Sequence, residues 1–162
     1  MTLRPKLLID VCVAPRASDK IVNFYTHIYP SLRIVPLIEI YRQNRSDAVW
    51  VKSLALEGGW IVVSADKGKD RKKPRLPQLC RDYRVTCVIM SSSLQNKGSA
   101  THQEVLHAIL ENIMPIYKAP GGTVISIGQI QEKGGLVRFA FRINRPKRPQ
   151  ISLSSFLETP NS

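Results

Sequence analysis

Short apolar runs alternate along the first part of the chain with segments in which apolar residues recur every three or four positions. The runs are typical of buried strands, and the longer spacing is typical of helices that bury one face. We expect strands at residues 7–13, 33–41, 60–65 and 85–90. We expect helices at residues 14–30, 46–57 and 76–83, with Ser46 as the N-cap of the second and Gly58-Gly59 as its end. Pro36 favours an edge position for the second strand.

The pattern changes in the last part of the chain. Residues 91–101 are polar and are expected to form a loop, and residues 102–117 have helical spacing. Residues 121–130 and 134–143 are expected to form two strands, as a hairpin or an addition to the sheet edge. Residues 145–162 are rich in Pro, Ser and charge, and we expect an extended or disordered basic tail that leaves residues 1–144 as one domain.

Alternation of strands and helices predicts an α/β protein with a mainly parallel sheet covered on both faces. In such sheets, sites lie at the carboxyl ends of the strands. Asp66 follows the third predicted strand and Asp10 lies near the end of the first. Asp47 begins the helix after the second strand, so all three acids can face one edge of the sheet.

Carboxylates crowded together resist ionisation, and a divalent cation removes this conflict. Mg²⁺ and Mn²⁺ prefer oxygen ligands, and two such ions about 3.5–4 Å apart can clamp the attacking and leaving oxygens of a phosphodiester. The simpler interpretations are a turn residue for Asp66, a helix-start charge for Asp47 and a surface ion pair for Asp70. Asp10 is harder to explain in this way, because an acid between Ile9 and Val11 is expensive to bury without a partner.

The charge balance favours a polyanionic partner. The 162-residue chain has 24 Lys and Arg against 12 Asp and Glu, a net charge of +12. Nucleic acid is the first candidate, ahead of an anionic membrane. A basic run follows Asp66, and it is either a solvated loop or a contact to phosphates; its cations next to the acids are Lys67, Lys69, Arg71, Lys72 and Lys73.

The remaining features point to a cytoplasmic protein without cysteine or histidine chemistry. No apolar run approaches the ~18 residues of a membrane span, and no signal-peptide pattern is present. Cys12, Cys80 and Cys87 lack metal-site spacing and are interpreted as reduced core thiols. The histidines are interpreted as surface or packing residues; they are His27, His102 and His107.

Three segments resemble the PIN-like domains of VapC-type toxins: "LLIDVCVAPR", "SDAVWVKSLALEGGWIVVSADKGK" and "LPQLCRDYRVTCVIMSSSL". The resemblance covers roughly residues 5 to 117. It implies a three-layer α/β/α fold, and we expect residues 1–144 to form one such domain. The hairpin predicted near the C-terminus is an addition that the smallest relatives lack. The resemblance also implies a Mg²⁺- or Mn²⁺-dependent ribonuclease, with RNA as substrate and a cognate antitoxin as partner.

The resemblance also assigns roles to residues. Asp10, Asp47 and Asp66 match the three acids of the family, and Ser64 matches the hydroxyl position of its Ser/Thr-x-Asp motif, where it would orient the Asp66 carboxylate. Asp70 could be a fourth acid, although Arg71 stands where relatives often have an aromatic residue. Glu39 is the reserve candidate.

Two function classes remain open. A metal-dependent endoribonuclease requires Asp10, Asp47 and Asp66, whereas a non-catalytic RNA- or DNA-binding module on the same fold does not. A two-component receiver domain is disfavoured, because Asp10 is not followed by a second acid. The oligomeric state also stays open, with a homodimer the commonest assembly.

Overall fold

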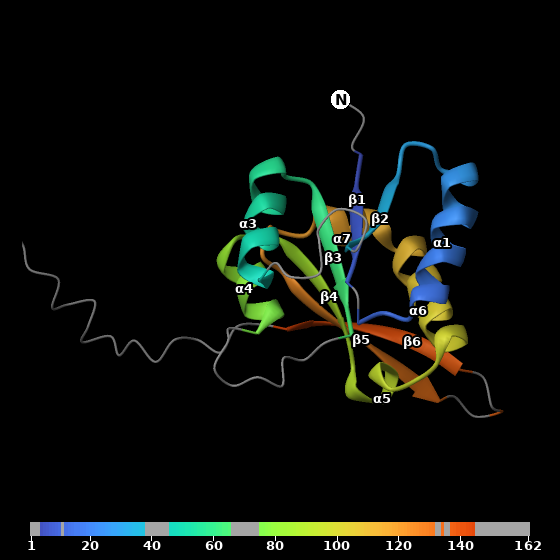
Figure 1. The fold of residues 1–162 in the computed structure, drawn as a ribbon. Coiled ribbons are helices and arrows are strands. Elements are labelled where there is room, and N and C mark those ends of the chain that lie inside the picture. The colour runs from blue at the N-terminus through green and yellow to red at the C-terminus, as the bar shows by residue number, and fades with distance from the viewer. Residues whose placement is uncertain are drawn as a thin grey trace, which may run out of the picture.

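A computed structural model gives the structure of the protein and describes residues 4–10, 12–37, 46–65, 75–131, 134 and 137–144. Strands and helices alternate through most of this length (Figure 1). In chain order they are β1 (Lys6–Ile9), α1 (Pro15–Ile28), β2 (Arg33–Pro36), α3 (Asp47–Glu57), β3 (Trp60–Ser64), α4 (Leu76–Asp82), β4 (Thr86–Met90), α5 (Ser92–Gln95), α6 (Ser99–Glu111), α7 (Ile113–Lys118), β5 (Val124–Gln131) and β6 (Val137–Asn144).

Six strands form one sheet in the order β2-β1-β3-β4-β5-β6. Neighbouring strands are parallel except for β5 and β6, which form an antiparallel pair. Figure 1 shows the sheet between two helical layers, with α1 and α6 on one side and α3 and α4 on the other. The predicted three-layer α/β/α architecture with an added C-terminal hairpin is therefore confirmed.

Each face of the sheet carries its own hydrophobic core. Leu7 and Ile9 of β1 belong to the core beneath α1 and α6, which we call the α1/α6 face. Leu8 of β1 belongs to the core beneath α3 and α4, the α3/α4 face, together with Trp50 and Val62. Alternate residues of one strand enter opposite cores because successive side chains of a strand point to opposite faces. This alternation fixes the face on which any strand residue lies.

The ends of α3 follow from local sequence. Ser46 occupies the N-cap position, although its side chain makes no capping hydrogen bond. The helix ends at Gly58, which has a φ of 75°. Glycine adopts this left-handed conformation without the steric penalty of a side chain. The predicted start and end of this helix are both confirmed.

Two predicted strands are too long. β1 ends at Ile9 and not at residue 13, because the chain turns after Asp10, whose carbonyl accepts a hydrogen bond of 3.0 Å from the N–H of Val13. β2 ends at Pro36, which has no N–H for the ladder. β2 is an edge strand, as Pro36 predicts. Leu37 is not part of the strand, and residues 38–41 of the predicted strand lie outside the described residues.

The prediction for residues 91–117 is also corrected. The predicted loop contains α5 and the start of α6, and the predicted single helix is two helices that meet at Asn112. Pro115 has no N–H to bond the carbonyl of Glu111, so α6 cannot continue through it. The predicted tail, residues 145–162, lies outside the described residues. In the ranges given above, no helix has the length and apolar content needed to cross a membrane.

Candidate active site

Asp10 and Ser64 meet where β1 and β3 end. The Ser64 Oγ donates a hydrogen bond of 2.6 Å to the Asp10 Oδ2, across 54 positions of sequence. Asp10 is 6% exposed and Ser64 is fully buried. Ile9 lies opposite Val63 in the parallel pair, and the Asp10 N–H continues the ladder to the Val63 carbonyl at 2.9 Å. The register of two strands therefore fixes this contact.

The pair lies where the order of the sheet reverses. From β1 the chain proceeds to β2 on one side and later to β3 on the other. The strand order makes the gap between β1 and β3 a topological switch point, where loops leave the carboxyl edge in opposite directions and ligands bind in open α/β sheets. Asp10 and Ser64 thus occupy the position at which the fold favours a site.

Both side chains lie on the α3/α4 face. Ile9 and Val63 belong to the core of the α1/α6 face, so the next residue of each strand points the other way. Cys87 of β4 belongs to the α3/α4 core, and its pKa is affected by the Asp10 carboxylate. That electrostatic contact agrees with the placement of Asp10 from strand alternation.

Asp47 begins α3, as predicted. Two glycines separate the end of α3 from β3, so the helix runs back along the strand. Its 11 residues span about 16 Å at ~1.5 Å per residue, close to the length of β3, which brings its start to the carboxyl edge of the sheet. Asp47 is exposed, and its Oδ1 accepts a hydrogen bond of 3.0 Å from Trp50 Nε1. This contact ties the start of the helix to a buried tryptophan.

The structure gives Ser64 a partner that the family motif does not name, because its hydroxyl donates to Asp10. The predicted contact between Ser64 and Asp66 stays a prediction, because Asp66 lies outside the described residues. The other predicted site residues lie outside the described residues; they are Glu39, Asp66, Lys67, Lys69, Asp70, Arg71, Lys72 and Lys73. Within the described ranges, no three His, Cys, Asp or Glu side chains gather closely enough to hold a metal ion.

Comparison with known families places this geometry in context. A family model described as a PIN like domain matches residues 5–92, just over half of the chain. The chain belongs to the PIN-like domain family. Neither the search of curated proteins nor the search of solved structures found a match.

Membership in the PIN-like family has a general chemical meaning. PIN-like domains are in general nucleases, and they generally depend on divalent metal ions. The match runs from the start of β1 to the start of α5, so it includes Asp10, Asp47 and Ser64. The later elements, from α6 to β6, lie beyond it.

The donor set of this PIN-like domain fits a hard divalent cation. Its described groups at the carboxyl edge are the carboxylates of Asp10 and Asp47 and the hydroxyl of Ser64. Mg²⁺ and Mn²⁺ prefer such oxygen ligands to nitrogen or sulfur. A buried carboxylate is also unfavourable unless it is paired or coordinates a metal.

The buried thiol of Cys87, near this site, is not suited to act as a nucleophile. A hydrogen bond with Cys80, burial and the nearby Asp10 carboxylate raise the pKa of Cys87 well above its usual value. Since the thiolate is the nucleophile, Cys87 is kept in the unreactive thiol form. Cys12 is exposed, so the prediction of a core thiol is wrong for that residue.

Two of the histidines pack inside the protein. His102 is buried, and its Nδ1 accepts a hydrogen bond of 3.0 Å from the N–H of Ala14. Its Nε2 therefore carries the proton and donates to the Leu94 carbonyl at 3.0 Å. The Nδ1 of His107 shares a hydrogen bond of 2.9 Å with the Tyr25 hydroxyl. His102 and His107 therefore have the packing role, and the exposed His27 has the surface role, which are the two roles predicted for the histidines.

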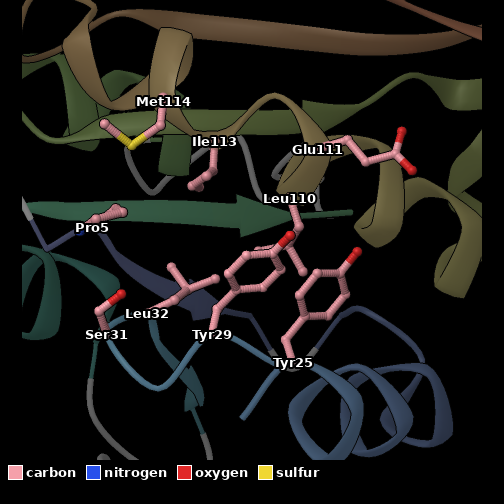
Figure 2. Close-up of a pocket in the computed structure, with 9 residues that line it drawn as sticks. All are labelled: Pro5, Tyr25, Tyr29, Ser31, Leu32, Leu110, Glu111, Ile113 and Met114. Carbon is pink, nitrogen blue, oxygen red and sulfur yellow. The ribbon is translucent and has the colours of Figure 1, made fainter. Parts of the chain in front are cut away.

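A cavity of about 410 Å³ lies at the opposite edge of the sheet, beside the residues that precede β1 and β2. Figure 2 shows the rings of Tyr25 and Tyr29 side by side, with Glu111 turned away from Pro5. Burial, Glu111 and Tyr29 raise the pKa of Tyr25. Among the described residues, the lining contains one carboxylate and no Lys or Arg, which does not suit a phosphate. These lining residues are Pro5, Tyr25, Tyr29, Ser31, Leu32, Leu110, Glu111, Ile113 and Met114.

Proposed function

We propose that this protein is a metal-dependent endoribonuclease that hydrolyses RNA phosphodiester bonds at the carboxyl edge of its sheet. The observation that carries the proposal is the buried Asp10–Ser64 hydrogen bond at the switch point of a PIN-like domain. A carboxylate is expensive to bury, and a fold retains such a group where it has a task.

The acids would share the work of holding Mg²⁺ or Mn²⁺. Asp10 and Asp47 are brought to the same edge by β1 and α3. We propose Asp66 as the third ligand, with Asp70 or Glu39 as a fourth. Ser64 is a positioning residue, because its hydroxyl fixes one oxygen of Asp10 and thereby the direction of the carboxylate.

A divalent cation in this position would supply Lewis-acid chemistry for phosphodiester hydrolysis. The chain would supply the orientation and the counter-charges. We propose that the basic run after Asp66 binds phosphates of the RNA backbone; its cations are Lys67, Lys69, Arg71, Lys72 and Lys73. Contacts to phosphates strengthen binding but do not depend on the base sequence. Cys87 has no nucleophilic role in this proposal, because its side chain is fully buried and its raised pKa favours the neutral thiol.

The decisive experiment compares RNA cleavage by the wild-type protein and by Asp10→Asn and Asp66→Asn. We expect cleavage with Mg²⁺ or Mn²⁺, none with EDTA, and a loss of at least about 100-fold in either variant, since each removes a metal-binding charge. Asp19→Asn is the matched control, because Asp19 is exposed on α1. RNA binding should persist in all variants.

Two outcomes would contradict this function. Cleavage that survives EDTA, or both site substitutions, would rule out the metal site. Metal-independent RNA binding without cleavage by the wild-type protein would instead favour a non-catalytic nucleic-acid-binding module.

The biological setting that we propose is a toxin–antitoxin pair in the cytoplasm. The support is the likeness of the three sequence segments to VapC-type toxins, and the partner would be an antitoxin encoded beside this chain. Expression in a bacterial host should then arrest growth, and Asp10→Asn should abolish the arrest. Growth arrest that persists in Asp10→Asn would separate the toxicity from the proposed chemistry.

A further inference from the structure

The strands β5 and β6 extend the sheet beyond the part that matches the PIN-like family. The family match ends at residue 92, whereas these strands span residues 124–144. They are long, with 8 residues each, against 5 in β3 and β4. β5 and β6 therefore add a surface to the sheet that the family match does not account for.

A single line of paired residues leads from the active site onto this surface. Asp10 and Ser64 are neighbours on β1 and β3, and Ser64 pairs with Ile89 of β4. Ile89 pairs with Ser126 of β5, and Ser126 pairs with Arg142 of β6. Four inter-strand steps of about 4.8 Å separate Asp10 from Arg142 along the sheet, roughly 19 Å.

All members of this line lie on the α3/α4 face. Paired residues of neighbouring strands share a face, and Ile89 belongs to the α3/α4 core. Phe139 and Phe141 of β6 pack against the opposite core, which agrees with Arg142 pointing away from it. The Asp10 carboxylate and the Arg142 guanidinium therefore stand on the same side of one continuous sheet.

Arginine side chains lie along β6 on that face. Arg138 and Arg142 are both exposed and lie four positions apart, so they point to the same side. Arg81 of α4 joins them at the far end of the strand, where its Nη2 donates to the Asn144 carbonyl at 3.4 Å. From Asn144 to Arg138 the strand extends about 20 Å at ~3.3 Å per residue. Three guanidinium groups are thus spread along the length of β6.

Small side chains form the floor between the arginines. Ser126 and Gly128 of β5 and Ala140 of β6 share this face and are half-buried. The Ser91 side chain borders Gly128, with a hydrogen bond between its Oγ and that of Ser93 at 3.0 Å. Such a surface lets a nucleic-acid backbone approach the sheet, while hydroxyl and guanidinium groups offer donors to phosphate.

We propose that the α3/α4 face of β5 and β6 binds phosphates of the RNA substrate and guides the strand toward Asp10. The inference rests on the proposed function, because RNA is taken as the ligand. Arginine suits this task, since its planar fork of donors matches phosphate geometry. The site would bind RNA without sequence preference, because every contact is to the backbone.

The test measures RNA affinity against salt concentration in the Asp10→Asn background, where the RNA stays intact. The probe is a labelled single-stranded RNA longer than the line from Asp10 to Arg138. We expect Arg138→Gln with Arg142→Gln to lower the slope of log affinity against log salt by about 1.4, since each phosphate contact to a single strand contributes about 0.7. Replacement of both arginines by Lys should restore the slope, because the charge is kept.

The control pair is Lys20→Gln with Lys118→Gln, which removes the same charge from exposed positions on α1 and α7. These helices contribute Ile21 and Ile116 to the core of the opposite face. An equal loss of slope in both pairs, or no loss in the arginine pair, would overturn the inference. No loss in the arginine pair would leave an acidic protein partner as the ligand of this face.

The experiments distinguish failure of the nuclease proposal from failure of the RNA-binding proposal for β5 and β6. Wild-type protein that never cleaves RNA would end the nuclease proposal, but the binding measurement would still be informative. An unchanged salt slope with normal cleavage would end only the proposal for β5 and β6.

Discussion

At the residue scale, the contact between Ser64 and Asp10 makes a specific prediction. Ser64→Ala removes the hydroxyl that fixes Asp10, so we expect a loss of about 10–100-fold in cleavage, typical of groups that orient a metal ligand. The free energy of unfolding should fall by about 1.5–3 kcal/mol, because a buried charged acceptor loses a hydrogen bond. Kinetics at increasing Mn²⁺ and urea denaturation measure the two effects.

A conservative variant separates positioning from packing at the same residue. Ser64→Thr keeps the hydroxyl and should retain most of the activity. If Ser64→Ala and Ser64→Thr lose activity equally, or if added Mn²⁺ has no effect on the Ser64→Ala defect, Ser64 does not position a metal ligand.

The sequence indicated Asp10 but not its partner. An acid inside an apolar run required a favourable contact, and that inference holds. The motif pairs Ser64 with Asp66, a near neighbour in sequence, and that contact stays a prediction because Asp66 lies outside the described residues. The contact to Asp10 depends on the register of β1 and β3, with Ile9 opposite Val63, and register cannot be read from either strand alone.

At the scale of elements, His102 connects three segments that pack on the α1/α6 face of the sheet. It lies on α6, accepts from Ala14 at the N-cap of α1, and donates to Leu94 of α5. His102→Ala leaves a buried N–H and a buried carbonyl without this partner. Because each unsatisfied group costs about 1–3 kcal/mol, we expect the free energy of unfolding to fall by about 2–4 kcal/mol.

Urea denaturation measures this loss, with His27→Ala as the control, because His27 is exposed near the end of α1. Equal stabilities of the two variants would show that the hydrogen bonds of His102 contribute little. RNA cleavage by the His102→Ala variant should fall only in proportion to the folded fraction of the protein. The reason is that the hydrogen bonds of His102 go to Ala14 and Leu94 and not to the site residues.

The elements up to β4 were predictable because their periodicity is strong, and their order is confirmed. The errors lie where hydrogen bonding overrides the apolar pattern. β1 stops early because Asp10 starts a turn, and α6 stops early because Pro115 removes a donor. The short helix α5 has four residues, too few to leave a periodic signal.

At the scale of the whole molecule, the sheet and its cores continue well past the family match. Eight of the twenty buried residues in the α1/α6 core follow residue 92; they are Leu94, Val105, Leu106, Ile109, Leu110, Ile116, Ile125 and Ile127. At about 1.5–3 kcal/mol for each buried side chain, their burial contributes about 12–24 kcal/mol. The net stability of a domain is only about 5–15 kcal/mol, so we do not expect the matched segment to fold by itself.

We therefore predict that a fragment of residues 1–92 is unfolded, whereas a fragment of residues 1–144 folds with the thermal midpoint of the full chain. The first lacks β5, whose loss would leave β4 as an unpaired edge and expose Val88 and Met90. Circular dichroism and thermal denaturation of both fragments measure the outcome. A cooperative transition in residues 1–92 would show that the later elements are an appendage, and a much lower midpoint for residues 1–144 would assign a stabilising role to residues 145–162.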